Sequence, residues 1–147
     1  MTEVLEPGWL DLTDDADDLV PGLRGYVALV AAALAVGLES CATDPYSPAS
    51  AYIALDVRLS RYPKRDVALL WDERQGWSVC VETHSGEDLI VVAYLGRDLL
   101  APPATVQMFV EAVVAGLPVG RTEPPTMAPC DRDVLVDRLR GYAGVIA

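Results

Sequence analysis

Four apolar segments follow one another between residues 50 and 95, and this run constrains the fold more than any other feature of the chain. In the first, AYIALDVRLS, apolar residues alternate with small or charged ones, which is the two-residue period of a half-buried strand. The others cover residues 67–71, 77–83 and 89–95, and short polar stretches separate them. Strands joined by such short turns run antiparallel. The sequence therefore predicts a four-stranded antiparallel meander.

Helical periodicity flanks this meander on both sides. Apolar residues recur every three or four positions from Leu19 to Leu34, from Val106 to Val114, and again from Val134 to Tyr142. Residues 41–50, with two prolines, are expected to form a connecting loop. The predicted order is α-β-β-β-β-α-α, an α+β domain in which helices cover the sheet. The last helix could instead reach a partner chain.

The final strand segment, LIVVAYL, is apolar at every position. A strand that is apolar on both sides is typical of the centre of a sheet or of a doubly covered position. We therefore expect this strand to be central or covered on both faces.

The first 18 residues differ from the rest of the chain. They carry an acidic run from Asp11 to Asp18 and are expected to form an arm that leads into the first helix, with residues 19–147 forming one domain. The run lacks the central glycine of a calcium-binding loop, so calcium is not expected. Trp9, Leu10 and Leu12 leave open a second interpretation, in which the arm is a short docking peptide.

Charge and cysteine content narrow the choice of partner and compartment. The 147 residues include 22 acidic and 11 basic side chains, a net charge of -11, which disfavours binding to nucleic acid or to a membrane surface. The longest apolar run, residues 26–38, is too short to cross a bilayer. The acidic beginning of the chain lacks the pattern of an export signal, and the three cysteines form no CxxC motif. We expect a cytoplasmic protein.

The aromatic residues of the meander suggest a first candidate site. A hairpin that sets Trp71 opposite Trp77, and a second that sets Trp77 opposite Tyr94, would align the three in one row across three strands. This row is either a core ladder beneath the helices or the wall of an apolar ligand pocket. In the second interpretation Tyr52 joins the wall, and the polar groups are Glu82, His84 or Asp56.

The opposite face of the 77–83 strand carries Cys80 and Glu82, and His84, the chain's one histidine, follows at the turn. Residues four apart on a strand are separated by about 13 Å, so Cys80 and His84 cannot activate one another. Glu82 and His84 are about 6.6 Å apart and could share a metal only if other ligands came from another chain or from Glu87 or Asp88. We therefore assign no catalytic residue, no metal site and no cofactor.

The central block contains several short motifs, which are Leu-Leu-Trp-Asp at 69–72, Gly-Trp at 76–77, Tyr-Leu-Gly at 94–96 and Pro-Pro-Ala-Thr-Val at 102–106. These motifs are similar to those of an actinobacterial family of domains of unknown function. The resemblance extends over residues 22–116. It implies a bacterial cytosolic origin and brings no activity, cofactor or functional residue.

These observations lead to two hypotheses about function. The first is a noncatalytic protein-binding or regulatory module of a bacterial cytosol, a homodimer or the partner of another protein. It rests on the acidic charge and on the absence of any catalytic motif from the sequence. The alternative is a cofactor-independent small-molecule-binding protein, or an enzyme of specialised metabolism, that uses the aromatic-lined pocket. An apolar cavity reaching those aromatic residues would favour the alternative.

Overall fold

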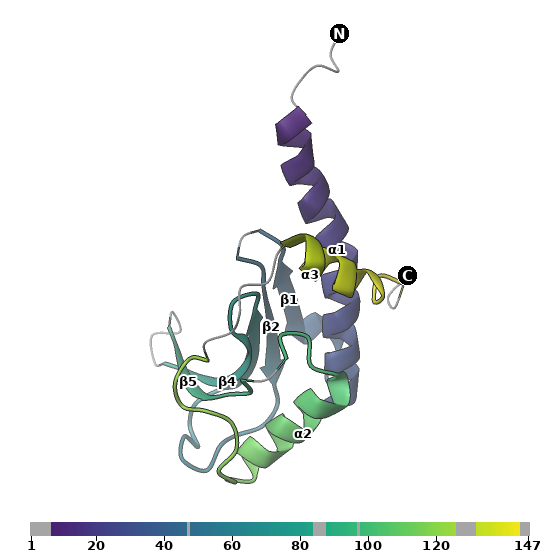
Figure 1. The fold of residues 1–147 in the computed structure, drawn as a ribbon. Coiled ribbons are helices and arrows are strands. Elements are labelled where there is room, and N and C mark those ends of the chain that lie inside the picture. The colour runs from purple at the N-terminus through teal and green to yellow at the C-terminus, as the bar shows by residue number, and fades with distance from the viewer. Residues whose placement is uncertain (1–6, 47, 84–87, 97, 126–131, 145–147) are drawn as a thin grey trace.

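The computed structural model describes residues 7–46, 48–83, 88–96, 98–125 and 132–144, and only the backbone of residues 7–18. His84 and Glu87, two residues of the predicted turn cluster, lie outside the described residues. The elements are α1 (Pro7–Ala33), the short 3-10 helix η2 (Leu38–Ser40), β1 (Cys41–Asp44), β2 (Ser50–Leu55), β3 (Val67–Asp72), β4 (Gly76–Glu82), β5 (Leu89–Tyr94), α2 (Pro103–Val114) and α3 (Arg132–Arg140) (Figure 1).

The predicted α+β class with an antiparallel sheet is confirmed, but the sheet has five strands, in the order β1-β2-β3-β4-β5. The extra strand is β1, which lies within the stretch predicted to be a loop. It is four residues long, it has no fully buried side chain, and a proline follows it, so its sequence carries little strand signal. Its pairing with β2 brings Thr43 opposite Ala51.

The turn chemistry of the first predicted hairpin forms as expected between β3 and β4. The Asp72 carboxylate accepts hydrogen bonds from the backbone N–H groups of Arg74 and Gln75, each at 2.7 Å. Gly76 follows with a φ of 73°, a backbone conformation that favours glycine. Trp71 is consequently opposite Trp77, as predicted.

The second predicted hairpin has a different register. Cys80 is opposite Val91, but Val79 is opposite Ala93, so Val92 is an extra residue that forms a bulge in β5. Tyr94 is therefore opposite Ser78, and the predicted pairing of Tyr94 with Trp77 is wrong. Because successive side chains of a strand point to opposite faces, this one-residue shift places Tyr94 on the other face of the sheet.

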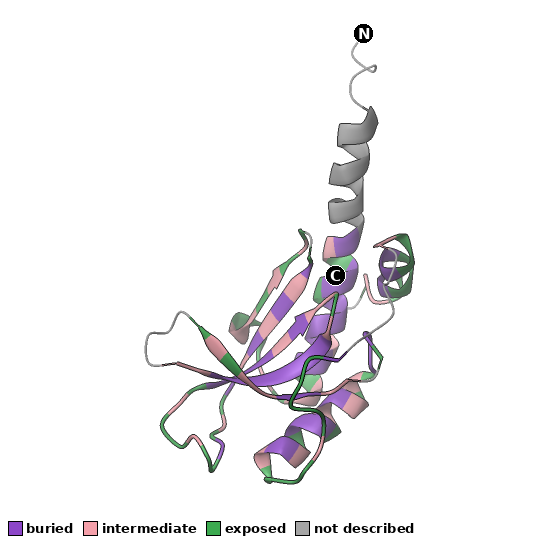
Figure 2. Ribbon diagram, turned by 60° about the vertical axis from the view of Figure 1, so that its left-hand side comes forward, coloured by how far each residue is buried: buried purple, intermediate pink, exposed green. Residues whose placement is uncertain are grey.

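Helices α1 and α2 cover one face of the sheet, and the core lies between these helices and the sheet. Leu19, Leu23, Tyr26 and Val30 of α1 are completely buried. Burial alternates along β2 and extends through the first six of the seven residues of β4 (Figure 2). Helix α1 begins at Pro7, so the last residues of the predicted arm have a helical backbone. Whether residues 1–18 act as a separate unit stays a prediction.

Helix α3 packs against α1 of the same chain. Two glycines of α1 allow this close approach, since a Cβ atom at Gly22 would lie 2.5 Å from the carbonyl oxygen of Leu139. Leu135 and Leu139 of α3 are completely buried there. In the structure, the last helix therefore packs against α1 of its own chain, and contact with a partner stays a prediction.

Candidate functional site

The two tryptophans predicted to line a pocket are core residues. Trp71 and Trp77 are each 1% exposed, and both indole N–H groups have hydrogen-bond partners. Trp71 donates to the carbonyl oxygen of Leu99 at 2.8 Å, and Trp77 donates to the hydroxyl oxygen of Tyr26 at 2.9 Å. The Tyr26 hydroxyl in turn donates to the carbonyl oxygen of Ala101, and burial raises the pKa of that hydroxyl. These polar groups stabilise the interior and are not directed at a ligand.

Tyr52, Glu82 and Tyr94 lie on the opposite face of the sheet from the two tryptophans. The Tyr52 hydroxyl donates a hydrogen bond of 2.9 Å to the Glu82 carboxylate. Burial and this hydrogen bond raise the pKa of Tyr52 to about 12. Because the sheet separates the two groups, the predicted aromatic residues do not line one pocket. Ligand binding by Tyr52, Glu82 or Tyr94 stays a prediction.

Cys80, on the same face as Tyr52, is completely buried. Burial raises the pKa of its thiol, although the Ser78 hydroxyl, 3.6 Å from the sulfur, acts in the opposite direction. A buried thiol with a raised pKa is a poor nucleophile. In the structure Cys80 is a residue of the buried interior.

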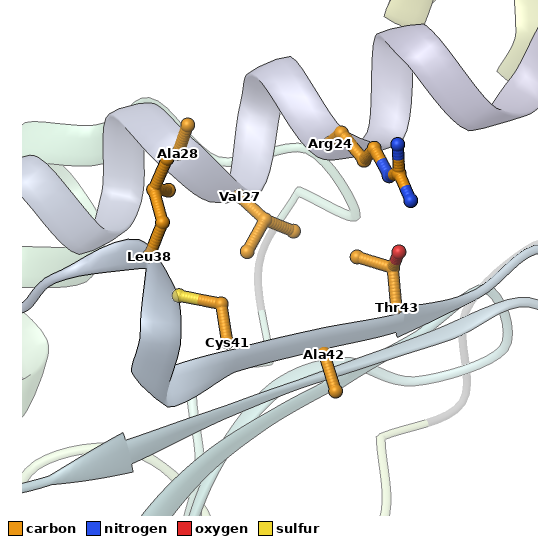
Figure 3. Close-up of a pocket in the computed structure, with 7 residues that line it drawn as sticks. All are labelled: Arg24, Val27, Ala28, Leu38, Cys41, Ala42 and Thr43. Carbon is orange, nitrogen blue, oxygen red and sulfur yellow. The ribbon is translucent and has the colours of Figure 1, made fainter. Parts of the chain in front are cut away.

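The candidate site is a groove between α1 and the edge strand β1, which we call the strand groove (Figure 3). Its volume is about 390 Å³. Figure 3 shows Cys41 and Thr43 pointing from β1 toward α1, whereas Ala42 points away. The lining residues are Arg24, Val27, Ala28, Leu38, Cys41, Ala42 and Thr43.

The hydrogen-bond pattern shows which backbone groups of β1 face outward. Glu73 donates its backbone N–H to the carbonyl oxygen of Ala49 at 3.0 Å. This bond shows which alternate residues of β2 direct their backbone N–H and C=O groups toward β3 and which direct them toward β1. By the same alternation, Tyr52 points its backbone groups at β1, toward Ala42. The N–H and C=O of Thr43 therefore point away from the sheet. Across the described ranges, no strand or isolated bridge pairs with that side of β1.

Two exposed apolar side chains flank this free edge. Leu38 precedes β1 and is 54% exposed, and Tyr46 follows it and is 70% exposed. The Asp44 carboxylate accepts the backbone N–H of Tyr46 at 3.0 Å, which holds the turn after the strand. A free strand edge with apolar surface at both ends has the features of a site for an extended peptide.

Most of the described side chains that line the strand groove are uncharged. Arg24 is the only charged side chain that lines it, so no carboxylate or histidine of the described lining can act as an acid or base. Burial, with a smaller effect of Glu39, raises the pKa of the Cys41 thiol. That thiol lies 3.7 Å from the carbonyl oxygen of Gly37. A thiol whose pKa is raised in this way is a weak nucleophile near neutral pH.

The described residues show neither a metal centre nor a membrane-spanning helix. No group of three or more His, Cys, Asp and Glu side chains in the described part of the chain is arranged to hold a metal ion. Within the same residues, no helix combines the length and the apolar character that a membrane crossing requires.

Sequence reasoning missed the strand groove because it treated residues 41–50 as a loop. The groove exists only when β1 pairs with β2 and α1 packs above them. The signal that the sequence does offer is weak: Leu38 and Tyr46, two large apolar residues, stand on either side of a short segment ending in proline.

Comparisons with known proteins place the chain in a family without giving it an activity. Neither the curated proteins nor the solved structures contain a significant match. One family profile, described as Family of unknown function (DUF6292), matches residues 26–112, from the last third of α1 nearly to the end of α2. That match includes all of the sheet and six of the seven residues of the strand groove. The chain belongs to this family of unknown function, DUF6292.

Proposed function

We propose that this chain is a noncatalytic protein-binding module of an actinobacterial cytosol, which takes an extended segment of a partner as a sixth strand on β1. The observation that carries the proposal is the outward N–H and C=O of Thr43, at a free strand edge beside an apolar groove. Main-chain hydrogen bonds to such an edge supply affinity, and pockets for alternate side chains supply specificity.

The added strand is the segment of another protein or β1 of a second copy. In a continuous sheet, residues that are opposite each other on neighbouring strands have side chains on the same face. When β1 pairs with β1 of a second copy around a two-fold axis, one residue at the centre must therefore be opposite the same residue of the other copy. With Thr43 at that centre, each copy donates one N–H to the other. The net charge of -11 per copy opposes this homodimer and favours a partner without acidic charge.

The small-molecule alternative has less support, because its aromatic wall is divided. Trp71 and Trp77 are inside the core, and Tyr52 and Tyr94 are on the other face. A ligand in contact with all four would have to pass through the sheet.

The test is a selection of random twelve-residue peptides against the purified protein, followed by calorimetry of the selected peptides. Thr43→Pro removes the outward N–H and leaves the β1–β2 ladder in place, so we expect peptide affinity to fall about tenfold or more. Thr43→Val keeps the N–H and is the matched control, with an expected change of less than about threefold.

Hydrogen exchange gives an independent measurement of the same contact. The Thr43 amide should exchange more slowly when a peptide is bound, and sedimentation velocity over a range of concentrations should report any β1-mediated dimer. Peptides that bind the Thr43→Pro variant as tightly as the unchanged protein would contradict strand addition. So would an unchanged exchange rate at Thr43.

A further inference from the structure

A second groove lies at the C-terminal end of α1, and we infer that it binds a small organic cation with an aliphatic body. Three segments form its walls: residues 33–36 at the end of α1, residues 55–57 at the end of β2, and one side of α2 between residues 107 and 115. Its volume is about 580 Å³, which is within the range of small-molecule sites. We call it the helix groove.

The floor of the helix groove is the uncovered edge of the hydrophobic core. Leu34, Val36, Val57 and Val114 pack against the core but are only partly buried. An aliphatic ligand body would remove their remaining apolar surface from water, which is the main favourable contribution in such sites. The lining contains no aromatic side chain, so aliphatic packing is the available contact.

Both charged side chains that line the helix groove are carboxylates, Asp56 and Glu111. Each is exposed, and Gln107 donates a hydrogen bond of 3.2 Å to Glu111. No lining residue carries a positive charge, so the balancing cation must come from the ligand. An anion of the same shape would be repelled by the same two groups and by the net charge of -11.

The backbone around the helix groove favours a small molecule over a peptide. Leu55, the last residue of β2, pairs with Val67 of β3. On the α2 wall, the carbonyl oxygen of Glu111 accepts the backbone N–H of Ala115 at 2.9 Å. These walls therefore offer an extended peptide few free main-chain partners, and the groove suits a small molecule better. The α1 wall is fixed by a turn in which Val36 donates its N–H to the carbonyl oxygen of Ala31 at 2.9 Å, with Ala35 at a φ of 58°.

The test is an NMR titration of the full chain with hexyltrimethylammonium, which combines a cationic head with an aliphatic body. Hexanoate carries the opposite charge on a similar body, and tetramethylammonium has the charge without the body. We expect hexyltrimethylammonium to shift the amide signals of Val57 and Val114 in a saturable way and the other two probes to have little effect. An unlabelled twelve-residue peptide rich in lysine tests whether a protein side chain occupies the groove instead.

Two double variants separate the site from general electrostatics. Asp56→Asn with Glu111→Gln should weaken binding about three- to tenfold, the effect of removing two exposed charge pairs. Glu123→Gln with Asp137→Asn removes the same charge outside the helix groove and should leave the affinity unchanged. Equal losses in both variants, equal binding of hexanoate, or stronger binding of the lysine peptide would overturn the inference.

This inference is independent of the proposed function. The helix groove shares no lining residue with the strand groove. Failure of the cation titration would leave strand addition on β1 untouched, and failure of the peptide experiment would leave the cation site untouched.

Discussion

The two edge strands of the sheet differ in whether another segment of the chain pairs with them. At β5, Tyr94 exchanges two backbone hydrogen bonds with Arg121, of 2.7 and 2.8 Å, so a later segment covers that end of the strand. The bulge at Val92 further interrupts the strand. Covering segments and bulges are two of the ways in which proteins prevent unwanted pairing at a sheet edge.

Among the described residues, β1 has neither a covering segment nor a bulge. The Thr43 backbone groups face outward, and the segments on either side of the strand expose Leu38 and Tyr46. The strand is short, at four residues, which limits uncontrolled pairing. The β5 edge is therefore covered by the chain itself, whereas the β1 edge is open, and the proposed function assigns that open edge to a partner strand.

A single added methyl group at Gly120 should disturb the covered edge of the sheet at Tyr94 of β5. A Cβ atom at Gly120 would lie 2.5 Å from the carbonyl oxygen of Tyr94 and 2.8 Å from the Phe109 ring. Gly120→Ala should therefore lower the free energy of unfolding by about 2–4 kcal/mol, from backbone strain and steric overlap together. Chemical denaturation followed by tryptophan fluorescence measures this loss.

Gly116 provides the matched control for Gly120→Ala. Gly116 and Gly120 have similar positive φ angles, 80° and 75°, but nothing lies within 4 Å of a Cβ atom at Gly116. Gly116→Ala should cost only the strain, about 1 kcal/mol. If the two alanine variants lose the same stability, the close contact with Tyr94 does not help to hold the β5 edge closed.

The open edge can be tested by placing proline at neighbouring positions of β1. Ala42 points its N–H into the β1–β2 ladder, so Ala42→Pro should lower the free energy of unfolding by about 2–3 kcal/mol. Thr43 points its N–H outward, and Thr43→Pro should change stability by less than about 0.5 kcal/mol. Urea denaturation distinguishes the two, and the reverse order would assign the outward N–H to Ala42.

The difference between the two edges was not visible in the sequence. The segment LIVVAYL is apolar at every position and was expected to be central or doubly covered, yet β5 is the last strand of the sheet. Within β5 only Ala93 and Tyr94 are buried, at the end that pairs with Arg121, whereas Ile90 is 41% exposed. The bulge at Val92 also could not be predicted, because either register buries apolar side chains and periodicity cannot choose between them.

Local turn chemistry, in contrast, was sufficient for the β3–β4 hairpin. Asp72 and Gly76 each act within five residues, and the pairing of Trp71 with Trp77 follows from them. The strand groove depends on residues of α1 and β1 that are brought together only by the complete fold. Its lining carries no catalytic motif, so the candidate site could not be predicted from local patterns.

The smallest expected effect concerns Cys41, which reports whether the open edge is occupied. In a Cys130→Ala background the remaining thiols are Cys41, half-buried in the strand groove, and Cys80, which is completely buried. Because burial and Glu39 raise the pKa of Cys41, its alkylation by iodoacetamide should be slow near neutral pH and should accelerate as the pH rises. Glu39→Gln lowers that pKa and should increase the rate at pH 8 by about two- to threefold.

A peptide added to β1 should slow the modification of Cys41, measured by mass spectrometry, whereas hexyltrimethylammonium in the helix groove should not. If a peptide binds without protecting Cys41, its site lies elsewhere. The open β1 edge would then have no role in peptide binding.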